Sequence, residues 1–498
     1  MPSELPPADP AFGWRWDPSY ARLPEGFHRR VAPTPVSAPR WGLFNRPLAE
    51  SLGLRAESLD QPGHAEYFTG NRLFAGSEPI AQAYAGHQFG NLTRLGDGRA
   101  ILLGEHLDPA TRRWDIQLKG PGLTPYSRGG DGRAALGPML REYLISEAMH
   151  ALGIPTTRSL AVALTGEPVF REETLPGAVL TRVAASHLRV GTFELFSALG
   201  DVQALKTLAD YALRRHFPER ADGPHPGKAL LEAVVERQSA LVAQWMRVGF
   251  VHGVVNTDNV AVSGETLDYG PCAFLDAYDP STVFSSIDRQ GRYAFGNQPK
   301  ITSWNLARFA EALLPILAPD EAGAIEVAQA CLESFPARFR RDWLAAYRGK
   351  LGLVTEEDGD AGLIEELLAW MHATEADFTR TFRRLRPDAA PEATVATDSA
   401  APDTRFLDWH RRWTHRLERQ GLPLPRVLDA MSRHNPVIIP RNHAVQAALD
   451  AASQRQDWAP FHALLTALQT PYREDDAPES LSQPPPPGTP RCRTFCGT

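Results

Sequence analysis

The sequence has few cysteines, no basic tail and no long apolar run. Four cysteines among 498 residues exclude a scaffold held together by disulfides, and none of them forms a Cys-x-x-Cys pair. No segment approaches the roughly 18 consecutive apolar residues that a membrane-spanning helix needs, and the first residues lack the basic and apolar regions of a secretory signal. A net charge of -7 disfavours binding to nucleic acid, which rests on neutralising phosphates. We therefore expect a cytoplasmic protein with neither a membrane nor a nucleic-acid partner.

What is present is an ordinary globular composition divided into four stretches. A hydrophobic content of 43% and a charged content of 22% fit a globular protein, and the length allows two or three domains. Residues 1–80 are rich in Pro, Trp and Phe and predict an extension that wraps over a core. Residues 81–185 predict a lobe of strands with one helix, and residues 186–472 predict a helical lobe with an exposed Pro/Ala/Asp/Thr-rich insert near 386–404. Residues 473–498 predict a flexible tail.

The most informative stretch is His-Gly-Val-Val-Asn-Thr-Asp258-Asn259, which is followed by Asp268-Tyr-Gly. Two neighbouring loops would bring these carboxylates and the amide close together. Magnesium prefers such oxygen ligands and shares them with substrate phosphates, as in protein kinases, where an Asn and the Asp of Asp-Phe-Gly hold the metal ions. Val254 stands where a kinase carries its catalytic base, so the pattern is kinase-like but altered. Asp and Asn in loops are also common turn formers, which is the alternative interpretation.

A lysine and a glutamate complete the set that phosphate chemistry requires. Trp114-Asp-Ile-Gln-Leu-Lys119 alternates like a strand, and Glu142 lies beside the apolar stripe of a helix that begins near Pro138. A carboxylate in that place costs desolvation energy unless it meets a cation, so we predict an ion pair between Lys119 and Glu142. In kinases such a pair holds the phosphate-binding lysine. Exposure of both side chains to solvent is the alternative.

Two glycine-rich turns lie near this lysine. Gly96-Asp-Gly98-Arg99 predicts the turn of a β-hairpin over residues 89–105, because Asp-Gly suits the positive φ angles of a tight hairpin turn. The missing side chains would also let the backbone approach a phosphate, with the arginine as a forked donor. A second glycine-rich turn follows at residues 129–133. A plain surface hairpin is the alternative for the first turn.

Two further strands, at residues 160–164 and 177–183, complete a predicted antiparallel sheet. The predicted fold class is therefore α+β: a protein-kinase-like two-lobed fold with an antiparallel-sheet N-lobe and a helical C-lobe with extensions. Arg182 and Arg189 lie where the chain would cross between the lobes. They suit bidentate binding of phosphate oxygens, but spacing alone equally allows them to be solvated.

Together these residues resemble one family, the selenoprotein O family of kinase-fold proteins, also described as protein adenylyltransferases. The match runs from about Tyr84 to Leu314. Its specific segments are Tyr84-Ala-Gly-His-Gln-Phe-Gly, Leu95-Gly-Asp-Gly-Arg-Ala, Gln117-Leu-Lys-Gly-Pro-Gly, Thr124-Pro-Tyr-Ser-Arg, His252-Gly-Val-Val-Asn-Thr-Asp-Asn and Asp268-Tyr-Gly-Pro. The resemblance implies transfer of AMP from ATP to a hydroxyl of a protein substrate. It also implies that ATP is flipped relative to ordinary kinases, so that the α-phosphate faces the acceptor.

The resemblance further implies a role for each site residue. Asp258 would be the catalytic base, and Asn259 and Asp268 would hold Mg²⁺ or Mn²⁺. Lys119 would bind phosphate and would be held by Glu142. The nucleotide would be contacted by Gly96, Gly98, Arg99, Lys119, Asp131, Gly132, Arg182, Arg189 and Asp268. UTP is the alternative donor, the acceptors would be Ser, Thr or Tyr hydroxyls of proteins, and the chain itself is a candidate acceptor.

The tail fits the same resemblance. Family members carry a selenocysteine or cysteine close to the C-terminus, and Cys496 holds that place. In bacterial relatives this cysteine can bridge to one just after the metal-binding Asp, the position of Cys272, and a tail of roughly 25 residues is long enough to reach it. A free Cys272 buried in the core is the alternative. The final Gly-Thr departs from the serine-rich ending of the family.

Two other functions stay open on the sequence alone. A conventional kinase would transfer the γ-phosphoryl group to its acceptor. A pseudokinase would bind the nucleotide as a scaffold without catalysis, which Val254 at the usual base position would explain. AMP transfer is favoured over the scaffold because both metal ligands are kept, and a scaffold does not need them.

Overall fold

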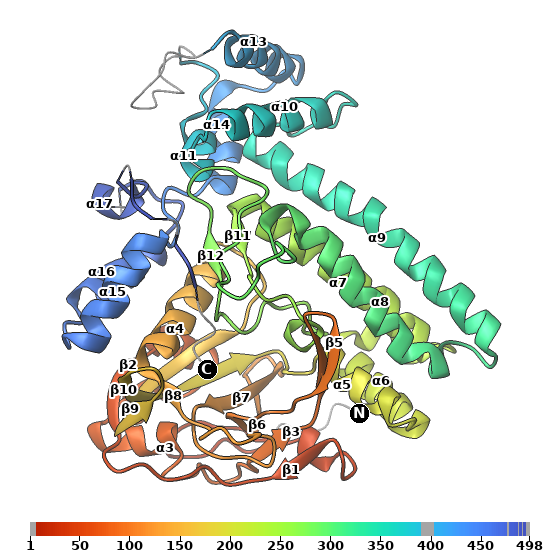
Figure 1. The fold of residues 1–498 in the computed structure, drawn as a ribbon, viewed down its shortest axis with the longest axis vertical. Coiled ribbons are helices and arrows are strands. Elements are labelled where there is room, and N and C mark those ends of the chain that lie inside the picture. Colours follow the sequence, from red (N-terminus) through yellow and green to blue (C-terminus); the bar gives the residue numbers. More distant parts are fainter. Residues whose placement is uncertain (1–5, 390–402, 476–477, 487, 491, 495–498) are drawn as a thin grey trace.

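The structure is a computed structural model that describes residues 6–389, 403–475, 478–486, 488–490 and 492–494 (Figure 1). It is an α+β structure with an antiparallel sheet at one end and a large group of helices at the other. Residues 390–402, most of the predicted insert, lie outside the described residues. Among the described helices, none combines the length and the apolar character that a membrane crossing requires.

The sheet has eight strands that pair antiparallel in the order β1-β3-β6-β7-β10-β9-β2, with β8 beside β10. Their bounds are β1 (His28–Arg30), β2 (Arg40–Phe44), β3 (Ile80–Gln82), β6 (Ala100–Leu107), β7 (Arg113–Lys119), β8 (Ala134–Ala135), β9 (Arg158–Phe170) and β10 (Thr174–Ala184). Arg182 of β10 pairs with Gln117 of β7, and Leu180 pairs with Lys119. Because side chains alternate across a strand, these four side chains share one face of the sheet.

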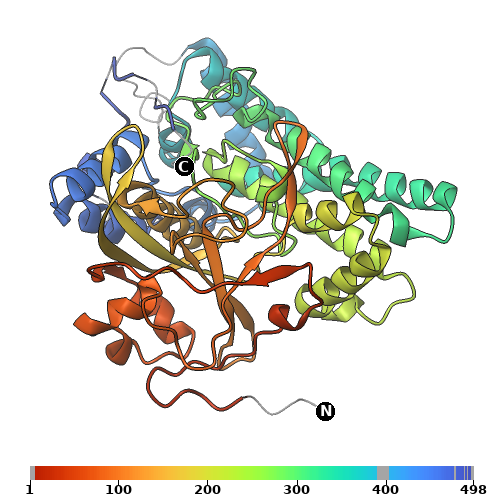
Figure 2. The same cartoon turned by 60° about the horizontal axis from the view of Figure 1, so that its bottom comes forward.

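The two faces of the sheet belong to two hydrophobic cores. Leu102 and Leu180 join the main core, together with helix α4 (Leu136–Ala151) and the helical part of the chain. Leu103 and Leu118 point to the other face and join a second core. That core is closed by the N-terminal segment, with Phe12, Trp14 and the helices α1 (Arg46–Ser51), α2 (Ala56–Leu59) and α3 (Ala65–Thr69). Figure 2 shows this segment lying under the sheet. Residues 1–80 therefore supply edge strands as well as a cover, and residue 80 itself begins β3.

The hairpin predicted over residues 89–105 is wrong. The strand β5 (Asn91–Arg94) pairs with β4 (Ala85–Gln88) and not with β6. The turn between them is Phe89-Gly90, whose φ angles of 49° and 91° are both positive, as a two-residue hairpin turn requires. Gly96-Asp97-Gly98 instead connects β5 to β6 without a regular turn. The Asp-Gly pair does not form a hairpin turn here, because Gly96 and Gly98 allow the backbone to pack closely against the segment that contains Tyr126.

The rest of the chain is mainly helical. The helices are α5 (Val190–Ala198), α6 (Val202–His216), α7 (Pro226–Val248), α8 (Gln298–Leu317), α9 (Glu321–Lys350), α10 (Asp360–Ala373), α11 (Phe378–Arg384), α13 (Thr404–Arg419), α14 (Leu424–His434), α15 (Asn442–Gln454) and α16 (Ala459–Leu468). The helices α7, α8 and α9 pack on one another, and the short strands β11 (Phe250–Val251) and β12 (Ala273–Phe274) flank the segment that carries Asp258. The helices α15 and α16 return to pack against α4 (Figure 1).

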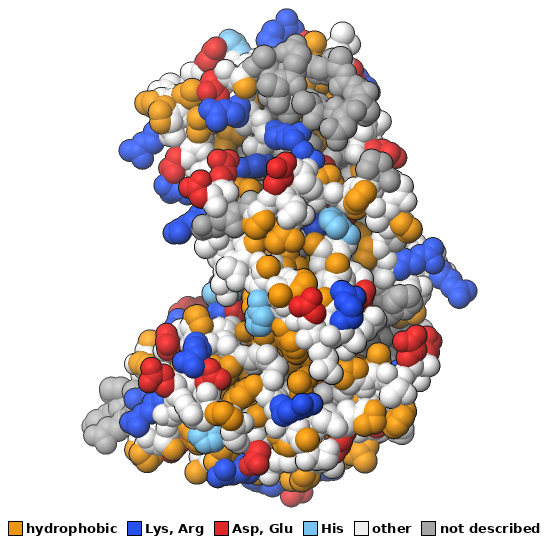
Figure 3. Space-filling view, turned by 90° about the vertical axis from the view of Figure 1, so that its left-hand side faces the viewer, with side chains coloured by type: hydrophobic (Ala, Val, Ile, Leu, Met, Phe, Trp, Pro, Cys, Tyr) orange, Lys and Arg blue, Asp and Glu red, His pale blue; other side chains and the backbone are white. Residues whose placement is uncertain are grey.

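Part of the described tail is docked on the molecule. The described tail includes the short helix α17 (Glu479–Ser482). Near the end, the Thr494 N–H donates to the Phe284 carbonyl at 2.8 Å, and the Ser286 N–H donates to the Thr494 carbonyl at 3.0 Å. Cys492 packs partly buried against the main core. Figure 3 shows one side of the molecule, on which acidic and basic side chains are interspersed.

Candidate active site

A single cleft between the sheet and the helical part holds most of the predicted site residues. Its volume is about 690 Å³. Of the residues predicted from the sequence, its lining includes Gly96, Gly98, Arg99, Lys119, Asp131, Gly132, Arg182, Arg189, Asp258, Asn259 and Asp268. Glu142 lies behind Lys119 and is not part of this lining. Cys272 is buried elsewhere, and Cys496 lies outside the described residues.

An ion-pair network forms the floor of the cleft. The Lys119 ammonium donates to Glu142 Oε2 at 2.7 Å and to Asp268 Oδ1 at 3.1 Å. The Arg182 guanidinium bridges the same two carboxylates, and Arg189 Nη1 donates to Asp268 Oδ2 at 2.9 Å. The ion pair expected between Lys119 and Glu142 is thus present. It forms because β7, β10 and α4 place these side chains on one face of the sheet.

The charges of this network compensate one another inside the protein. Burial by itself would raise the pKa of the Asp268 carboxyl, but the charges of Arg182, Lys119 and Arg189 outweigh burial and hold that pKa well below its usual value. Burial also opposes ionisation of Glu142, whose pKa is nevertheless lowered by Arg182 and Lys119. Three cations therefore face two ionised carboxylates. The positive excess in a poorly solvated cleft favours an anionic ligand such as a phosphate.

Asp258 lies on the opposite wall, in the short 3-10 turn η4 (Thr257–Asn259). Its Oδ1 is buried and has no hydrogen-bond partner among the described residues. Burial raises the pKa of this carboxyl to about 6, although the charge of Arg189 acts in the opposite direction. The strand β4 passes directly over it, since a Cβ added at Gly86 would lie 2.3 Å from Asp258 Oδ1. Asp258 is thus a carboxylate that β4 holds in place while the residue lines the cleft.

Asn259 and Asp268 supply the oxygen atoms that fit a divalent metal. Asn259 Nδ2 donates to the Val254 carbonyl at 2.9 Å, which leaves the amide oxygen on the other side of the group for a ligand. Within the described chain, no three or more His, Cys, Asp or Glu side chains are grouped so that they could hold a metal by themselves. A site with few protein oxygens, completed by nucleotide phosphates, is the arrangement that Mg²⁺ commonly takes.

The first glycine-rich turn is shaped by a close approach to Tyr126. A Cβ at Gly96, whose φ is 86°, would lie 2.5 Å from the Tyr126 ring, and a Cβ at Gly98 would lie 2.8 Å from the Tyr126 carbonyl. Thr124 Oγ1 donates to the Asp97 carbonyl at 2.6 Å and fixes the contact. Glycine at positions 96 and 98 therefore allows these two segments to form one wall of the cleft.

The second glycine-rich turn lies at the mouth of the cleft. Asp131 pairs with Arg171, near the turn between β9 and β10, at 2.8 Å. The hydrogen bond from Arg171 lowers the pKa of the Asp131 carboxyl. A Cβ at Gly132 would lie 2.0 Å from the Gly122 carbonyl oxygen, so no larger residue fits there without a shift of the backbone.

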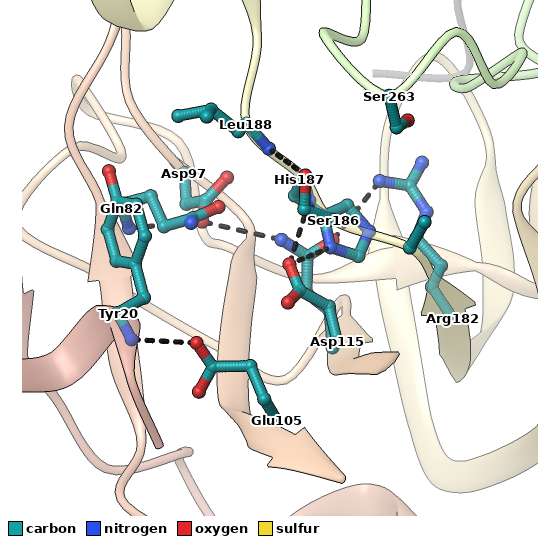
Figure 4. A network of polar contacts seen from close by, with 12 residues as sticks. Tyr20, Gln82, Asp97, Glu105, Asp115, Arg182, Ser186, His187, Leu188 and Ser263 are labelled. Atoms are coloured by element: carbon teal, nitrogen blue, oxygen red, sulfur yellow. Dashed lines mark hydrogen bonds and ion pairs between the residues drawn. The ribbon is translucent and has the colours of Figure 1, made fainter. Parts of the chain in front are cut away.

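Asp97 and Gln117 were not predicted as site residues, yet both support the ion-pair network through hydrogen bonds. Asp97 is 1% exposed, and its Oδ2 accepts from the Gln82 N–H at 3.0 Å and from Gln117 Nε2 at 3.4 Å. Gln117 Oε1 in turn accepts from Arg182 Nη1 at 3.3 Å. Figure 4 shows Asp97 beside Gln82, with Arg182 farther away on β10. Gln117 shares a strand face with Lys119, which is the signal that could have identified it; Asp97 looked like a turn residue.

A second missed feature fastens the β4–β5 hairpin to the helical part. His87 Nδ1 lies 2.6 Å from Glu194 Oε1 of α5. Thr257 Oγ1 donates to Glu194 Oε2 at 2.6 Å and accepts from the His87 N–H at 2.7 Å. Thr257 directly precedes Asp258, so the hairpin and the loop that carries this carboxylate are held as one unit. Tyr84 at the start of the hairpin stacks on the Arg189 guanidinium at 4.8 Å.

Cys272 is fully buried in the main core beside α4. Burial raises the pKa of its thiol to about 12. Arg141 Nη1 donates to the Cys272 carbonyl at 3.2 Å. In this structure Cys272 is therefore a packed thiol, and its predicted pairing with Cys496 involves a residue outside the described part of the chain.

Comparison with known proteins identifies the family of this chain. The family model described as "Protein adenylyltransferase SelO" matches residues 10–469. A protein nucleotidyltransferase YdiU of Alcanivorax borkumensis is 56% identical over 488 residues, covering 98% of this chain and 99% of the relative. Proteins of the same name are 55% identical in Shouchella clausii, over 97% of this chain and 99% of the relative, and 53% identical in Nitrosococcus oceani over the whole of both chains. The chain therefore belongs to the SelO family of protein adenylyltransferases and is an enzyme that transfers a nucleotide to proteins.

Proposed function

We propose that this enzyme uses a kinase-like two-lobed cleft to transfer AMP from ATP to Ser, Thr or Tyr hydroxyls of proteins. The triphosphate would be seated with its α-phosphorus toward Asp258. The observation that carries the proposal is that one cleft is lined both by a carboxylate, Asp258, and by the cations Lys119, Arg182 and Arg189. The carboxylate is complementary to the hydroxyl group of an acceptor, and the cations are complementary to the phosphates of a nucleotide.

The proposed nucleotide contacts follow from charge and from close approach of the backbone. Lys119, Arg182 and Arg189 would exchange part of their contact with Asp268 for phosphate oxygens, and Glu142 would keep Lys119 and Arg182 in place. Arg99, which lines the cleft beside Lys119, would add a forked donor. Gly96 and Gly98 would line the nucleotide, and Asp131 and Gly132 at the mouth would lie at the adenosine end.

Asn259 and Asp268 would hold Mg²⁺ or Mn²⁺ against the triphosphate. When bound, such an ion neutralises charge that develops on the phosphate oxygens. Support for this ligand pair comes from the amide oxygen of Asn259, which its hydrogen bond to Val254 leaves available, and from the ionised state of Asp268.

The proposed reaction is a single in-line displacement. The acceptor hydroxyl oxygen forms a bond to the α-phosphorus, and the bond from that phosphorus to the α,β-bridging oxygen breaks. The hydroxyl proton passes to Asp258, and pyrophosphate leaves. For a loose transition state, positioning and charge neutralisation contribute more than basicity. Asp258 is suited to positioning because Gly86 and the bond from Arg189 to its carbonyl fix it in place.

Two alternatives make different predictions for labelled ATP. Conventional kinase chemistry would leave label on the acceptor from [γ-32P]ATP, whereas the proposal leaves label only from [α-32P]ATP. Binding without any transfer, as Val254 in place of the kinase base would permit, would leave no label from either nucleotide. UTP as donor is tested in the same assay with [α-32P]UTP, and acceptor-free reactions test modification of the enzyme itself.

A further inference from the structure

A second cavity lies beside the active-site cleft and has no part in the proposed chemistry. It is a groove of about 530 Å³. We call it the flanking groove and define it by Phe89, Ile287, Arg289, Arg292, Lys300 and Trp304. The turn of the β4–β5 hairpin forms one wall, and the loop before α8 and the start of α8 form the others.

The flanking groove and the cleft share a wall. Asn256 lines the cleft, and its Oδ1 accepts from the Phe89 N–H at 3.2 Å and from the Tyr293 hydroxyl. Gln88 lines the cleft, whereas the next residue, Phe89, lines the groove. The groove therefore adjoins the cleft at the hairpin tip, next to the loop that carries both Asn256 and Asp258.

The groove carries an unbalanced positive charge. Arg289 and Lys300 are exposed, and neither forms an ion pair with another described residue. The lining has one acidic residue, Asp288, against the three basic residues Arg289, Arg292 and Lys300, and the Asp288 carboxylate accepts from the Arg292 and Tyr293 backbone N–H groups at 3.0 and 2.8 Å. The Arg292 guanidinium lies over the Trp304 ring at 4.5 Å, and its buried Nε has no hydrogen-bond partner among the described residues.

Apolar side chains lie next to these cations. Ile287 is 54% exposed and Phe89 is 38% exposed, so both offer apolar surface at this groove. The Phe89 ring is held edge-on to Tyr293 at 5.3 Å, so it is a fixed apolar contact. A binding partner complementary to this surface carries negative charge together with an apolar side chain.

We propose that the flanking groove binds an acidic segment of the acceptor protein, extended and bearing an apolar side chain, and thereby presents a nearby hydroxyl to Asp258. The inference rests on the proposed AMP transfer to proteins. It adds a preference among acceptors: hydroxyls flanked by Asp, Glu and a large apolar residue would be modified more efficiently than hydroxyls in basic segments.

The test uses two synthetic peptides with a central tyrosine and a flanking leucine, one with Asp and Glu and the other with Lys and Arg at the remaining positions. Binding to the full-length enzyme is measured by fluorescence anisotropy, and AMP transfer is measured separately by mass. We expect the enzyme to bind the acidic peptide about tenfold more tightly than the basic one, and the R289E/K300E variant to lose or reverse this preference. The R29E/K206E variant changes the charge equally at exposed positions outside both cavities and should keep it.

Equal binding of the two peptides, or an unchanged preference in R289E/K300E, would overturn the groove proposal. Displacement of the acidic peptide by a thymidine oligonucleotide at a lower concentration than by unlabelled peptide would also overturn it, in favour of a nucleic-acid ligand. Because the binding readout does not depend on transfer, failure of the groove is distinguishable from failure of the proposed reaction, in which binding persists but no AMP reaches peptide or enzyme.

Discussion

At the scale of single residues, the proposed base depends on a glycine of the neighbouring strand. Gly86 lets β4 pass so close to Asp258 that an added methyl group would meet the carboxylate at 2.3 Å. The bond from Arg189 to the Asp258 carbonyl, at 2.6 Å, fixes the other side of the same residue. The geometry of Asp258 is therefore set by its neighbours and not only by its own loop.

Gly86→Ala should displace the Asp258 carboxylate while leaving the ion-pair network intact. A shift of about 1 Å can cost about 100-fold in rate, so we expect a loss of AMP transfer of that order with ATP affinity nearly unchanged. Transfer from [α-32P]ATP and ATP titration give the two readouts. Gly223→Ala is the matched control, because a Cβ there meets its nearest atom, the Arg220 carbonyl oxygen, only at 3.5 Å. Full activity of the Gly86→Ala enzyme would contradict this account of the base.

Asp97 is the second residue whose environment makes a measurable prediction. Burial raises its pKa from 3.8 to about 6. The folded state thus binds the proton more tightly than the unfolded state, so the associated stability is fully present below pH 3.8 and is lost as the pH rises through about 6. Asparagine does not titrate. As the pH rises from about 4 to about 8, the parent loses this stability and the variant does not. The unfolding free energy of Asp97→Asn minus that of the parent should therefore increase by about 3 kcal/mol.

Urea denaturation of the nucleotide-free proteins at several pH values measures this difference. Other titrating groups are common to both proteins and cancel in the comparison. A difference in unfolding free energy that does not change with pH would show that Asp97 is not the buried acid that the structure describes.

At the scale of elements, three of them meet in the ion-pair network: β7, β10 and α4. Glu142 is the carboxylate that α4 contributes, and it neutralises both Lys119 and Arg182. Glu142→Gln leaves the three buried cations with Asp268 alone. Removing one partner of a buried ion pair costs about 3–5 kcal/mol, so we expect a loss of stability of this order together with weaker ATP binding.

Chemical denaturation and ATP titration check this expectation. Glu366→Gln serves as the control, because its pair with Arg412 is largely exposed and exposed pairs contribute less than about 1 kcal/mol. If Glu142→Gln and Glu366→Gln lowered the free energy of unfolding equally, the ion-pair network in the cleft would have to be exposed to solvent.

The same elements show what the sequence could and could not predict. Strand alternation and the apolar stripe of the helix led to the Lys119–Glu142 pair, because both signals are local. The hairpin prediction was wrong because it considered only the preference of Asp-Gly for tight turns. Gly96 and Gly98 are instead required by close contact with Tyr126, which belongs to a separate segment of the chain. The edge strands β1 and β2 are short and are defined by pairing with distant strands, so no local period indicated them.

The site residues predicted from local motifs do lie together in the structure. Asp258, Asn259 and Asp268 stand in motifs whose residue types fit phosphate chemistry, and the structure brings them into one cleft. Supporting residues such as Asp97 and Glu194 act through long-range hydrogen bonds. The residues next to Asp97 and Glu194 in the sequence do not indicate these distant partners.

At the scale of the whole molecule, both ends of the chain brace the sheet. The N-terminal segment closes its far face, and α15 and α16 pack on α4. The tail then docks through Thr494 on the loop at Phe284 and Ser286. These contacts bring the last described residues near the core that contains Cys272.

The predicted pairing of Cys272 with Cys496 is testable at this scale. After mild oxidation, we expect peptide mapping without reductant to find these two cysteines linked, and Cys272→Ser to abolish the linked peptide. Cys331, which is buried in the main core, should stay a free thiol and serves as an internal control. A linkage through Cys492 instead, or free thiols throughout, would rule the predicted pair out.

The central claim concerns which phosphorus meets the proposed base, and a structure of the enzyme with Mg²⁺ and an ATP analogue that resists cleavage between the α- and β-phosphates tests it most directly. The account predicts that the α-phosphorus lies nearest to Asp258, with the metal between Asn259 and Asp268 and the phosphate chain over Lys119. A complex in which the γ-phosphorus lies nearest to Asp258 would contradict it.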